Sequence, residues 1–433
     1  MIYLGGLIII LAIVAIIKKI EVRLVLFVAG ILMALLAGDI ASGVVGFTNA
    51  MTGSLVPIIA TVMGFAYVLK LTKCDEHLIN LVTKPLTKVR FILIPGTVIV
   101  TALINTALTS AAGVGAAVGA ILIPVLISSG VKPAVAGAAV LAGTFGSALS
   151  PGNVHVVAVA HIAEVEVMDI VAFIAPRVII STLIGAATLT VIAYIFKENK
   201  GYALEAEDGL GTGDKINDSS FKVSILKAIV PLMPLVILIL DANFNLLGYS
   251  YVDDVRTYNT ITVPQVMLLG VVLATIVSLN NPQEVSKSFF SGMGAAYADI
   301  IGIIIAATVF TTGMSLIGIT DALVQLMENS DGVAGIASVL GPYGLAVLSG
   351  SGDAATVAFN EAITPNAALF GLTVEQLGTT ASLASALGRT MSPVAGVTIV
   401  CASVAKVNPM ELAKRNAPGM IIAAIVLMIM MNF

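Results

Sequence analysis

Long uninterrupted runs of apolar residues recur along the whole chain of 433 residues, with short polar segments between them. A helix needs about 20 such residues to cross a bilayer. Because the runs are continuous rather than alternating, they predict spanning α-helices and not barrel strands. The ten predicted spans are 2–17, 24–38, 53–69, 134–162, 170–196, 224–240, 262–279, 297–318, 377–405 and 416–432. The first of them is expected to be a retained helix, since no cleavage-type segment follows it.

Two further stretches, 91–128 and 332–370, are apolar, then polar and rich in Gly, Ser and Thr, and then apolar again. If each enters and leaves the membrane on the same side, every lysine of the chain lies on one side. The opposite loops are then acidic, with Arg256 as their only cation. Full crossings would destroy this bias. We therefore expect two re-entrant hairpins, with the lysine side in the cytoplasm and both termini outside.

Composition agrees with a polytopic all-α membrane protein. Hydrophobic residues make up 58% of the chain and charged residues 11%, whereas soluble domains carry about 25% charged residues. The basic residues are scattered over loops, so a nucleic-acid partner is not expected. Cys74 and Cys401 lie far apart without partner spacing, so the sequence predicts neither a disulfide framework nor a metal site.

The chain resembles itself at a shift of 242 residues. The segment 146–180 aligns without gaps on 388–422 and shares eleven residues in thirty-five positions. The expected topology gives the two copies opposite orientations, which is typical of secondary transporters. We therefore predict two inverted-topology repeats. The first covers 1–196, with hairpin 91–128 and broken helix 134–162; a flexible cytoplasmic linker covers 197–223; the second covers 224–433, with hairpin 332–370 and broken helix 377–405.

The broken helices are predicted from two matched segments, G-S-A-L-S-P-G-N at 146–153 and S-A-L-G-R-T-M-S-P at 385–393. Proline removes a backbone donor and glycine permits irregular backbone, so both interrupt a helix. At membrane depth such a break is tolerated only around a solute or a water-filled cavity. A surface loop is the alternative, and the matched positions in two copies disfavour it.

The hairpin tips, N-T-A-L-T-S-A-A-G at 105–113 and S-G-S-G-D-A-A-T at 349–356, are matched under the same shift. Helix N-termini at such tips carry a partial positive charge suited to a carboxylate. Small residues also serve simply to pack helices closely, but two matched tips beside two matched breaks favour a binding site. The candidate substrate-binding residues are Thr109, Ser110, Ser150, Asn153, Ser351, Gly352, Arg389, Thr390 and Ser392.

Charged residues add a second set of candidates. Arg389 can bind a carboxylate through two parallel hydrogen bonds, or it can form a structural ion pair with Asp353, Glu361 or Asp299. These three acids are also the candidates for ion coupling. They are suited to carry protons, to bind Na⁺ or to neutralise Arg389, and the sequence leaves these roles open. His155, just after the first break, is either a proton relay or a polar histidine facing water.

Several function classes are excluded or disfavoured. The chain has no P-loop, so ATP is not the expected energy source. It has no nucleophile–base pair or H-E-x-x-H pattern, which argues against an enzyme. A channel requires a continuous pore, whereas an inverted repeat around a central site suits alternating access. No cofactor is predicted beyond a coupling Na⁺ or H⁺.

The segments G-R-T-M-S-P-V-A-G at 388–396 and V-A-K-V-N-P-M-E-L-A-K-R at 404–415 resemble the anaerobic C4-dicarboxylate carrier C (DcuC) family. G-S-G-D-A at 350–354 and A-A-Y-A-D at 295–299 are similar to the same family. The resemblance implies a member of the ion-transporter superfamily in a bacterial or archaeal cytoplasmic membrane. Its expected substrates are fumarate, succinate, malate or aspartate, moved by ion-coupled uptake, efflux or exchange.

The resemblance also implies a homodimer in which a transport domain moves like an elevator against a scaffold. The hairpins and broken helices then form the transport domain, and 2–69 and 224–280 form most of the scaffold. The chain departs from the family at Asp299 and Asp353, where the resemblance implies asparagine. Added carboxylates repel a dianion unless they are protonated or bind a cation. They therefore favour an alternative, an H⁺- or Na⁺-coupled carrier for amino acids or other carboxylates.

Overall fold

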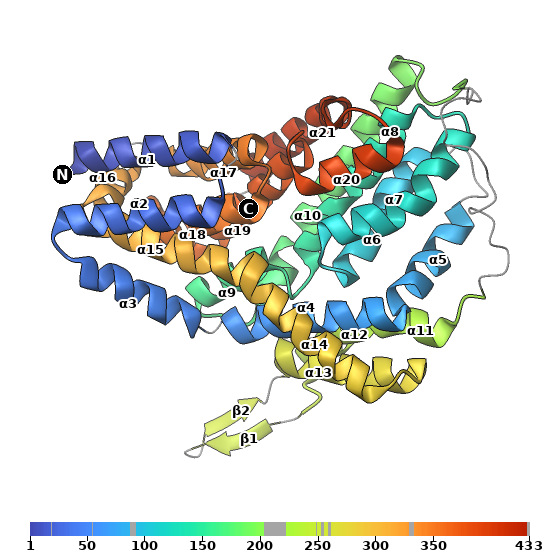
Figure 1. The fold of residues 1–433 in the computed structure, drawn as a ribbon, viewed down its shortest axis with the longest axis horizontal. Coiled ribbons are helices and arrows are strands. Elements are labelled where there is room, and N and C mark those ends of the chain that lie inside the picture. Colours follow the sequence, from blue (N-terminus) through green and yellow to red (C-terminus); the bar gives the residue numbers. More distant parts are fainter. Residues whose placement is uncertain are drawn as a thin grey trace.

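The computed structural model describes residues 1–18, 20–53, 55–86, 92–202, 222–247, 249–252, 255–258, 261–328 and 333–430. Helices make up nearly all of these residues (Figure 1). Within the described residues, seven helical stretches are long and apolar enough to cross a membrane, and shorter apolar helices accompany them. Most of the predicted linker 197–223 lies outside the described residues.

The helices before the linker are α1 (Ile2–Ile17), α2 (Val22–Ala37), α3 (Ile40–Met51), α4 (Leu55–Thr72), α5 (Cys74–Leu86), α6 (Leu93–Ala107), α7 (Ala111–Ser128), α8 (Pro133–Gly143), the 3₁₀ helix η2 (Thr144–Leu149), α9 (Val154–Ala163) and α10 (Val167–Ile195). Those after it are α11 (Ile225–Ile229), η3 (Val230–Leu232), α12 (Met233–Phe244), α13 (Val263–Ser278), α14 (Pro282–Ala296), η4 (Tyr297–Ile301), α15 (Gly302–Leu316), α16 (Ile319–Glu328), α17 (Val333–Ser349), α18 (Gly352–Ala362), η5 (Thr364–Phe370), α19 (Val374–Thr390), α20 (Gly396–Ala405) and α21 (Pro409–Met430).

Some elements differ from the predicted ones. The short helices α3, α5 and α16 were not expected. The span predicted at 297–318 is the second part of a longer helix that begins at Pro282 and passes through a π-helical turn, η4. Its first part, α14, carries polar residues along one face and therefore lacks the uniform apolar character of a predicted span. The all-α class is confirmed, and the described residues add one short antiparallel hairpin of β1 (Tyr249–Val252) and β2 (Val255–Tyr258) that was not predicted.

The helices pack in two groups. In one group α2 and α3 pack on α15, while α4 packs on α13 and α14. In the other group α6 packs on α8, α7 on α20, α17 on α19 and α10 on α21. Figure 1 shows this second group from its blue-green to its red helices, with the N-terminal helices beside it. The second group contains both predicted hairpins and both predicted broken helices.

The matched segments have matched structures. Helices α9 and α20 begin and end at positions that differ by 242 residues. Each is followed by a residue in the left-handed conformation, Glu164 with φ 56° and Lys406 with φ 54°. This conformation is uncommon for residues other than glycine. The next helices, α10 and α21, begin at Val167 and Pro409, which are again 242 apart.

Two matched glycines bring helix backbones into close contact. A Cβ atom added to Gly146, in η2, would overlap the carbonyl oxygen of Ala102 in α6. A Cβ atom added to Gly388, in α19, would overlap the carbonyl oxygen of Tyr343 in α17. In each case the first arm of a hairpin, α6 or α17, lies directly against a helical segment that ends a few residues later. Only glycine permits this approach.

We expect Gly146→Ala and Gly388→Ala each to destabilise the fold by at least about 1–3 kcal/mol, because the new methyl group forces two backbones apart. The measurement is the apparent Tm of the purified protein, which should fall in both variants. Gly344→Ala is the matched control, since no atom lies within 4 Å of its added Cβ. Equal Tm values for Gly388→Ala and Gly344→Ala would contradict the close packing.

Candidate substrate site

Four helices begin at interruptions in the second group of helices. Helix α7 follows the break at 108–110, α9 follows 150–153, α18 follows 350–351 and α20 follows 391–395. Residues from the first turns of all four helices line one cavity of about 300 Å³. Since helix N-termini carry unpaired N–H groups and partial positive charge, the cavity suits an anion.

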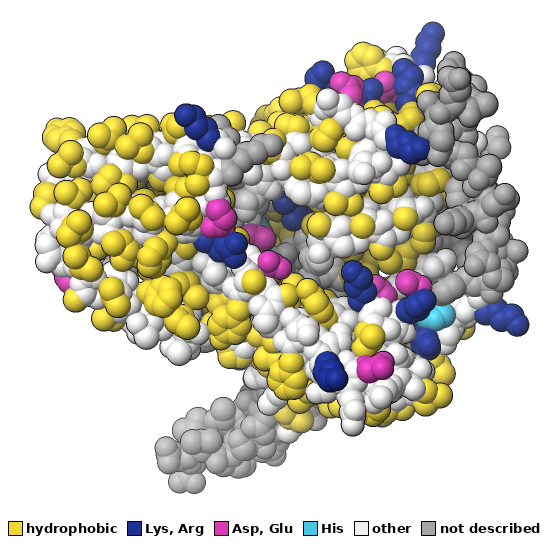
Figure 2. Space-filling view, viewed as in Figure 1, with side chains coloured by type: hydrophobic (Ala, Val, Ile, Leu, Met, Phe, Trp, Pro, Cys, Tyr) yellow, Lys and Arg dark blue, Asp and Glu magenta, His cyan; other side chains and the backbone are white. Residues whose placement is uncertain are grey.

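The cavity is lined by residues from both groups of helices. They are Ile59, Val62, Met63, Thr109, Ser110, Ala111, Ala112, Ser147, Gly152, Asn153, Val154, Asp299, Ile300, Asp353, Arg389, Gly396 and Val397. Figure 2 shows acidic and basic side chains gathered around a hollow near the middle of this face, whereas hydrophobic side chains cover its left part. The lining is therefore polar and charged on the side of the interrupted helices, and apolar where α4 closes it.

Side chains tie each hairpin to the neighbouring break. The Asn105 amide donates to the Leu108 carbonyl at 2.6 Å and accepts from the Ser147 N–H at 3.2 Å. In the other half, the Ser392 hydroxyl donates to the Val347 carbonyl at 2.7 Å. Asn105 is fully buried. Asn105 belongs to the predicted tip motif, but its positioning role depends on contacts that only the fold reveals.

The four N-termini are capped differently. Ser110, Asn153 and Ser351 each accept a backbone N–H of the helix that follows them. The cap position of α20 is Ala395, which has no side-chain acceptor. A side-chain cap normally satisfies one of the free N–H groups. The first turn of α20 therefore keeps all of its N–H groups free of side-chain caps, and Gly396 and Val397 line the cavity there.

Arg389 reaches the cavity from the last turn of α19. Its Nη2 donates to the Thr144 carbonyl at 3.2 Å, while its buried Nε has no hydrogen-bond partner. Among the described residues it forms no ion pair within 4.0 Å. The expected alternative of a direct ion pair with an acidic neighbour is therefore wrong for this conformation. A guanidinium that lines a cavity and has an unpartnered donor is suited to a carboxylate.

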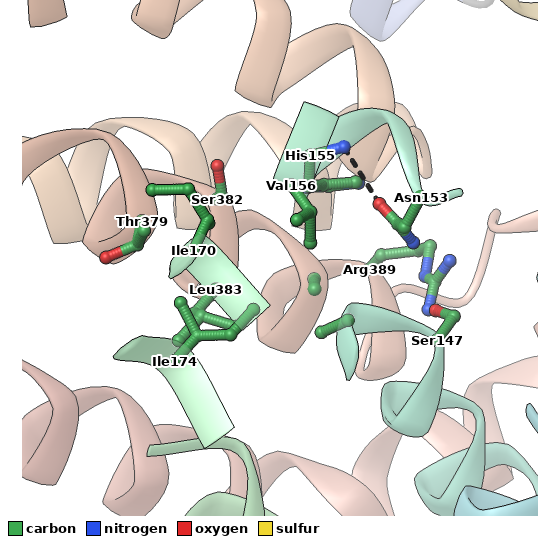
Figure 3. A pocket seen from close by; sticks show the side chains of 12 residues that line it. Ser147, Asn153, His155, Val156, Ile170, Ile174, Thr379, Ser382, Leu383 and Arg389 are labelled. Carbon is green, nitrogen blue, oxygen red and sulfur yellow. Dashed lines mark hydrogen bonds between the residues drawn. The ribbon is translucent and has the colours of Figure 1, made fainter. Parts of the chain in front are cut away.

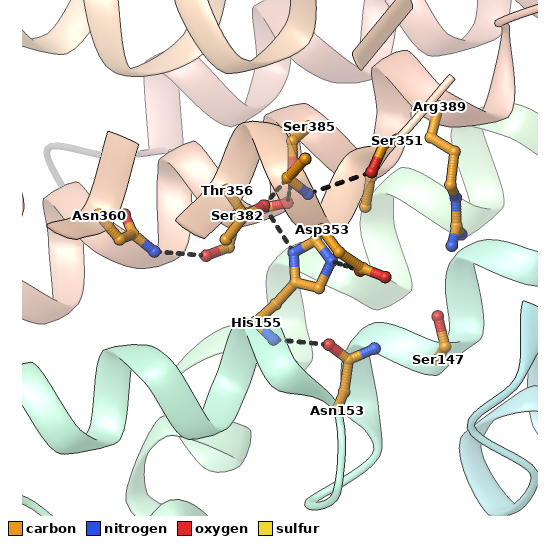
Figure 4. Close-up of polar contacts among 12 residues, drawn as sticks. Ser147, Asn153, His155, Ser351, Asp353, Thr356, Asn360, Ser382, Ser385 and Arg389 are labelled. Atoms are coloured by element: carbon orange, nitrogen blue, oxygen red, sulfur yellow. Dashed lines mark hydrogen bonds and ion pairs between the residues drawn. The ribbon is translucent and has the colours of Figure 1, made fainter. Parts of the chain in front are cut away.

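Asp353 pairs with a histidine from the other half of the chain (Figure 4). Its Oδ1 lies 2.7 Å from Nε2 of His155, and Nδ1 of His155 lies 2.8 Å from the Thr356 hydroxyl. His155 is 6% exposed, so it does not face water as one interpretation of the sequence held. The Asp353 side chain is 40% exposed and lines the cavity.

A smaller cavity of about 10 Å³ lies beside this pair (Figure 3). Polar side chains that line it include Ser147, Asn153, His155 and Arg389. This volume is about that of one water-sized probe. The small cavity therefore extends the polar surface from Arg389 toward the imidazole ring.

The structure brings together six of the twelve predicted site residues. The residues that line the large cavity are Thr109, Ser110, Asn153, Asp299, Asp353 and Arg389. Ser351 and Gly352 form the N-terminus of α18 next to Asp353. Ser150 is buried and lines a neighbouring cavity with Thr109.

The remaining three predicted residues are directed elsewhere. The Thr390 hydroxyl donates to the Ala386 carbonyl within its own helix, and Ser392 holds the end of α17. Glu361 lies near the other end of α18 and lines neither the large nor the small cavity. These three residues are therefore less suited to contact a solute in this conformation.

Comparison with solved structures gives the class of fold. The superposition on the antimetabolite efflux pump MtrF of Neisseria gonorrhoeae covers 92% of this chain and 83% of that chain, with a TM-score of 0.63 and 15% identity. The YdaH transporter of Alcanivorax borkumensis covers 90% and 86%, with a TM-score of 0.54 and 16% identity. The chain thus has the fold of a membrane transporter.

Sequence comparison gives the family. The chain belongs to the C4-dicarboxylate anaerobic carrier (DcuC) family, whose model matches residues 2–432. The anaerobic C4-dicarboxylate transporter DcuC of Escherichia coli K12 is 27% identical over 443 positions, 96% of this chain and 92% of that protein. An uncharacterized transporter of Haemophilus influenzae is 37% identical over 288 residues, 65% of this chain and 99% of that protein. The resemblance in the motifs is confirmed, and the chain is a transporter rather than an enzyme.

Solute entry into the cavity can be tested with a single cysteine. Ala112 is exposed and lines the cavity, so Ala112→Cys should react with a small charged thiol reagent. Bound dicarboxylate should slow this reaction by excluding the reagent. The background is Cys74→Ala with Cys401→Ala, which removes the two buried native thiols. Ala186→Cys, at a site 3% exposed, is the unreactive control. An unreactive Ala112→Cys would mean that the cavity is closed to solutes.

Proposed function

We propose that the chain is a secondary active transporter that moves C4-dicarboxylates such as fumarate, succinate, malate or aspartate across a bacterial or archaeal cytoplasmic membrane. Uptake, efflux or exchange is coupled to an ion. The observation that carries the proposal is Arg389, which lines a cavity where four helix N-termini converge and whose Nε has no hydrogen-bond partner. Membership of the carrier family supports the substrate class.

The cavity offers two places for carboxylates. One carboxylate binds the fork of the Arg389 guanidinium through paired hydrogen bonds. The other binds the free N–H groups of α20, or the first turn of α7 with the hydroxyls of Thr109 and Ser110. A volume of about 300 Å³ lies at the small end of ligand pockets. It therefore suits a solute of a few carbon atoms.

The proposed mechanism is elevator-like alternating access within a homodimer. The matched bounds of α9 and α20 support two inverted repeats, and the two packing groups support a scaffold and a transport domain. Where these groups meet, Val154, Val157 and Val357 pack into an apolar cluster with residues of α2, α4 and α15. Apolar contacts are not directional, so they permit sliding.

The alternative is an H⁺- or Na⁺-coupled carrier for amino acids or other carboxylates. The observation that favours it is that two acids, Asp299 and Asp353, line the cavity together with Arg389. Their charges suit an ammonium group and disfavour a dianion. Counterflow in proteoliposomes with a panel of dicarboxylates and amino acids distinguishes the two substrates. A channel, by contrast, would show conductance without saturable counterflow.

Arg389 provides the direct test of the site. Arg389→Ala should abolish counterflow, at least about a hundredfold, because the substrate loses a charge-assisted pair of hydrogen bonds. Arg389→Lys should not restore it, since an ammonium group lacks the planar fork. Expression and the elution profile should stay normal in both variants. Normal counterflow in Arg389→Ala would remove the residue from the site, and normal counterflow in Arg389→Lys would reduce it to a point charge.

The proposed orientation, with both termini outside, is tested by labelling from each side. Ser129 lies in the turn between α7 and α8, and exposed Asp321 lies in the first turn of α16. In the cysteine-free background, Ser129→Cys should react only with a reagent admitted to the cytoplasm. Asp321→Cys should react only from outside. Labelling of both positions from the same side would contradict the inverted arrangement of the hairpins.

A further inference from the structure

Four consecutive hydrogen-bonding contacts run from the cavity into α19 (Figure 4). Asp353 contacts Nε2 of His155 at 2.7 Å, and Nδ1 of His155 contacts the Thr356 hydroxyl at 2.8 Å. Thr356 in turn contacts the hydroxyl of Ser385. The Ser385 hydroxyl donates to the Ser382 carbonyl at 2.9 Å. Thr356 and Ser385 are fully buried, so water does not substitute for these partners.

The number of protons on these groups decides how many of the four contacts can form. Four contacts need four protons, and each contact needs one donor. With Asp353 ionised and His155 neutral, the chain holds only three protons, one each on the imidazole, Thr356 and Ser385. Three contacts then form, with Nε2–H donating to Asp353, Thr356 donating to Nδ1 and Ser385 donating to Thr356, but the contact from Ser385 to the Ser382 carbonyl is lost.

One additional proton completes the chain. When His155 is an imidazolium, Nε2–H donates to Asp353 and Nδ1–H donates to Thr356. The Thr356 hydroxyl then donates to Ser385, and Ser385 donates to the Ser382 carbonyl. The count is the same if the added proton resides on Asp353, because the neutral imidazole then accepts at Nε2 and donates at Nδ1. The pair and its hydroxyl partners thus form a site for one proton.

The charge of the cavity makes this proton relevant to the substrate. The charged side chains that line the two cavities beside His155, in the described part of the chain, are Arg389, Asp353 and Asp299. Helix α10 faces the small cavity with Ile170 and Ile174 instead. Without the proton these groups sum to one negative charge, so a dianion enters against repulsion. A protonated pair raises the sum to zero.

We propose that the His155–Asp353 pair takes up one proton when a dicarboxylate binds, so that the transporter is coupled to H⁺. The inference rests on the proposed function and names the coupling ion and its site. The proton comes from bulk water through the cavity, to which the Asp353 carboxylate is exposed. Because the pair joins α9 to α18, it links proton binding to the contact between the two halves of the chain.

The test is proton uptake on binding, measured by titration calorimetry of the purified transporter. Fumarate, succinate and aspartate are titrated between pH 6 and 9 in buffers with different ionisation enthalpies. In the wild type, uptake should approach one proton per bound substrate at high pH. Affinity should fall about tenfold per pH unit once the free pair has lost its proton. In His155→Gln and Asp353→Asn, uptake should fall close to zero and the affinity should lose this dependence on pH.

Two further variants separate proton binding from general damage. His161→Gln makes the same substitution in α9, at a position that lines neither cavity, and should retain the wild-type uptake. Ser385→Ala removes the acceptor that the Thr356 hydroxyl uses when Nδ1 of His155 is protonated, so Thr356 turns its proton to Nδ1 and the form without the added proton is favoured. The pH at which affinity falls should therefore move lower. This shift remains measurable if His155→Gln does not fold.

Each outcome bears on the inference. Substrate binding and counterflow without proton uptake at any pH would overturn the coupling site and leave the proposed function intact. Proton uptake that persists in both His155→Gln and Asp353→Asn would place the proton elsewhere and overturn the inference. An unshifted pH dependence of affinity in Ser385→Ala would also overturn it. Failure of the wild type to bind or exchange any solute of the panel would overturn the proposed function, and the inference with it.

Discussion

The fold depends on how backbone polar groups are satisfied where apolar helices are interrupted. Inside a membrane an unpaired N–H or C=O group costs several kcal/mol, which is comparable with the net free energy of folding of a small domain. In the described part of the chain, four such interruptions are followed by helix N-termini that meet around one cavity. The backbone groups there are capped by Ser110, Asn153 and Ser351 or face the cavity. A polar cavity at the centre is therefore a consequence of the interruptions and not a separate feature.

The helices that follow the two breaks have matching bounds, but the two halves place different side chains at the cavity. At the 242-residue shift, Arg389 corresponds to Ser147 and Asp353 to Ala111, while His155 corresponds to Val397. Each charged or titratable group thus has an uncharged counterpart in the other half. The matched helix bounds give the two breaks a similar local frame, and the substitutions make the site chemically one-sided. The second half presents Arg389 and the uncapped helix α20. The first half contributes His155, which pairs with Asp353 of the second half.

The sequence predicted the parts of the structure that depend on local chemistry. Glycine and proline marked the interruptions near Gly146 and Gly388, and hydroxyl-rich tips marked the starts of α7 and α18. Contacts between distant segments were not predictable in this way. His155 and Asp353 are 198 residues apart, and nothing in their local sequences indicates that they meet. Helix α14 was missed because its polar face lowers the mean hydropathy, although the helix continues without interruption into α15.

Several strong polar contacts lie within the second group of helices, and this bears on the proposed movement. Arg415 holds Glu198 through two hydrogen bonds of 2.7 and 2.9 Å, and these bonds lower the pKa of the Glu198 carboxyl. They fasten the end of α10 to α21, while His155 and Asp353 fasten α9 to α18. Toward the first group, α9 and α18 present valines instead. A unit that is held internally by directional bonds and bounded by apolar contacts can shift without breaking those bonds.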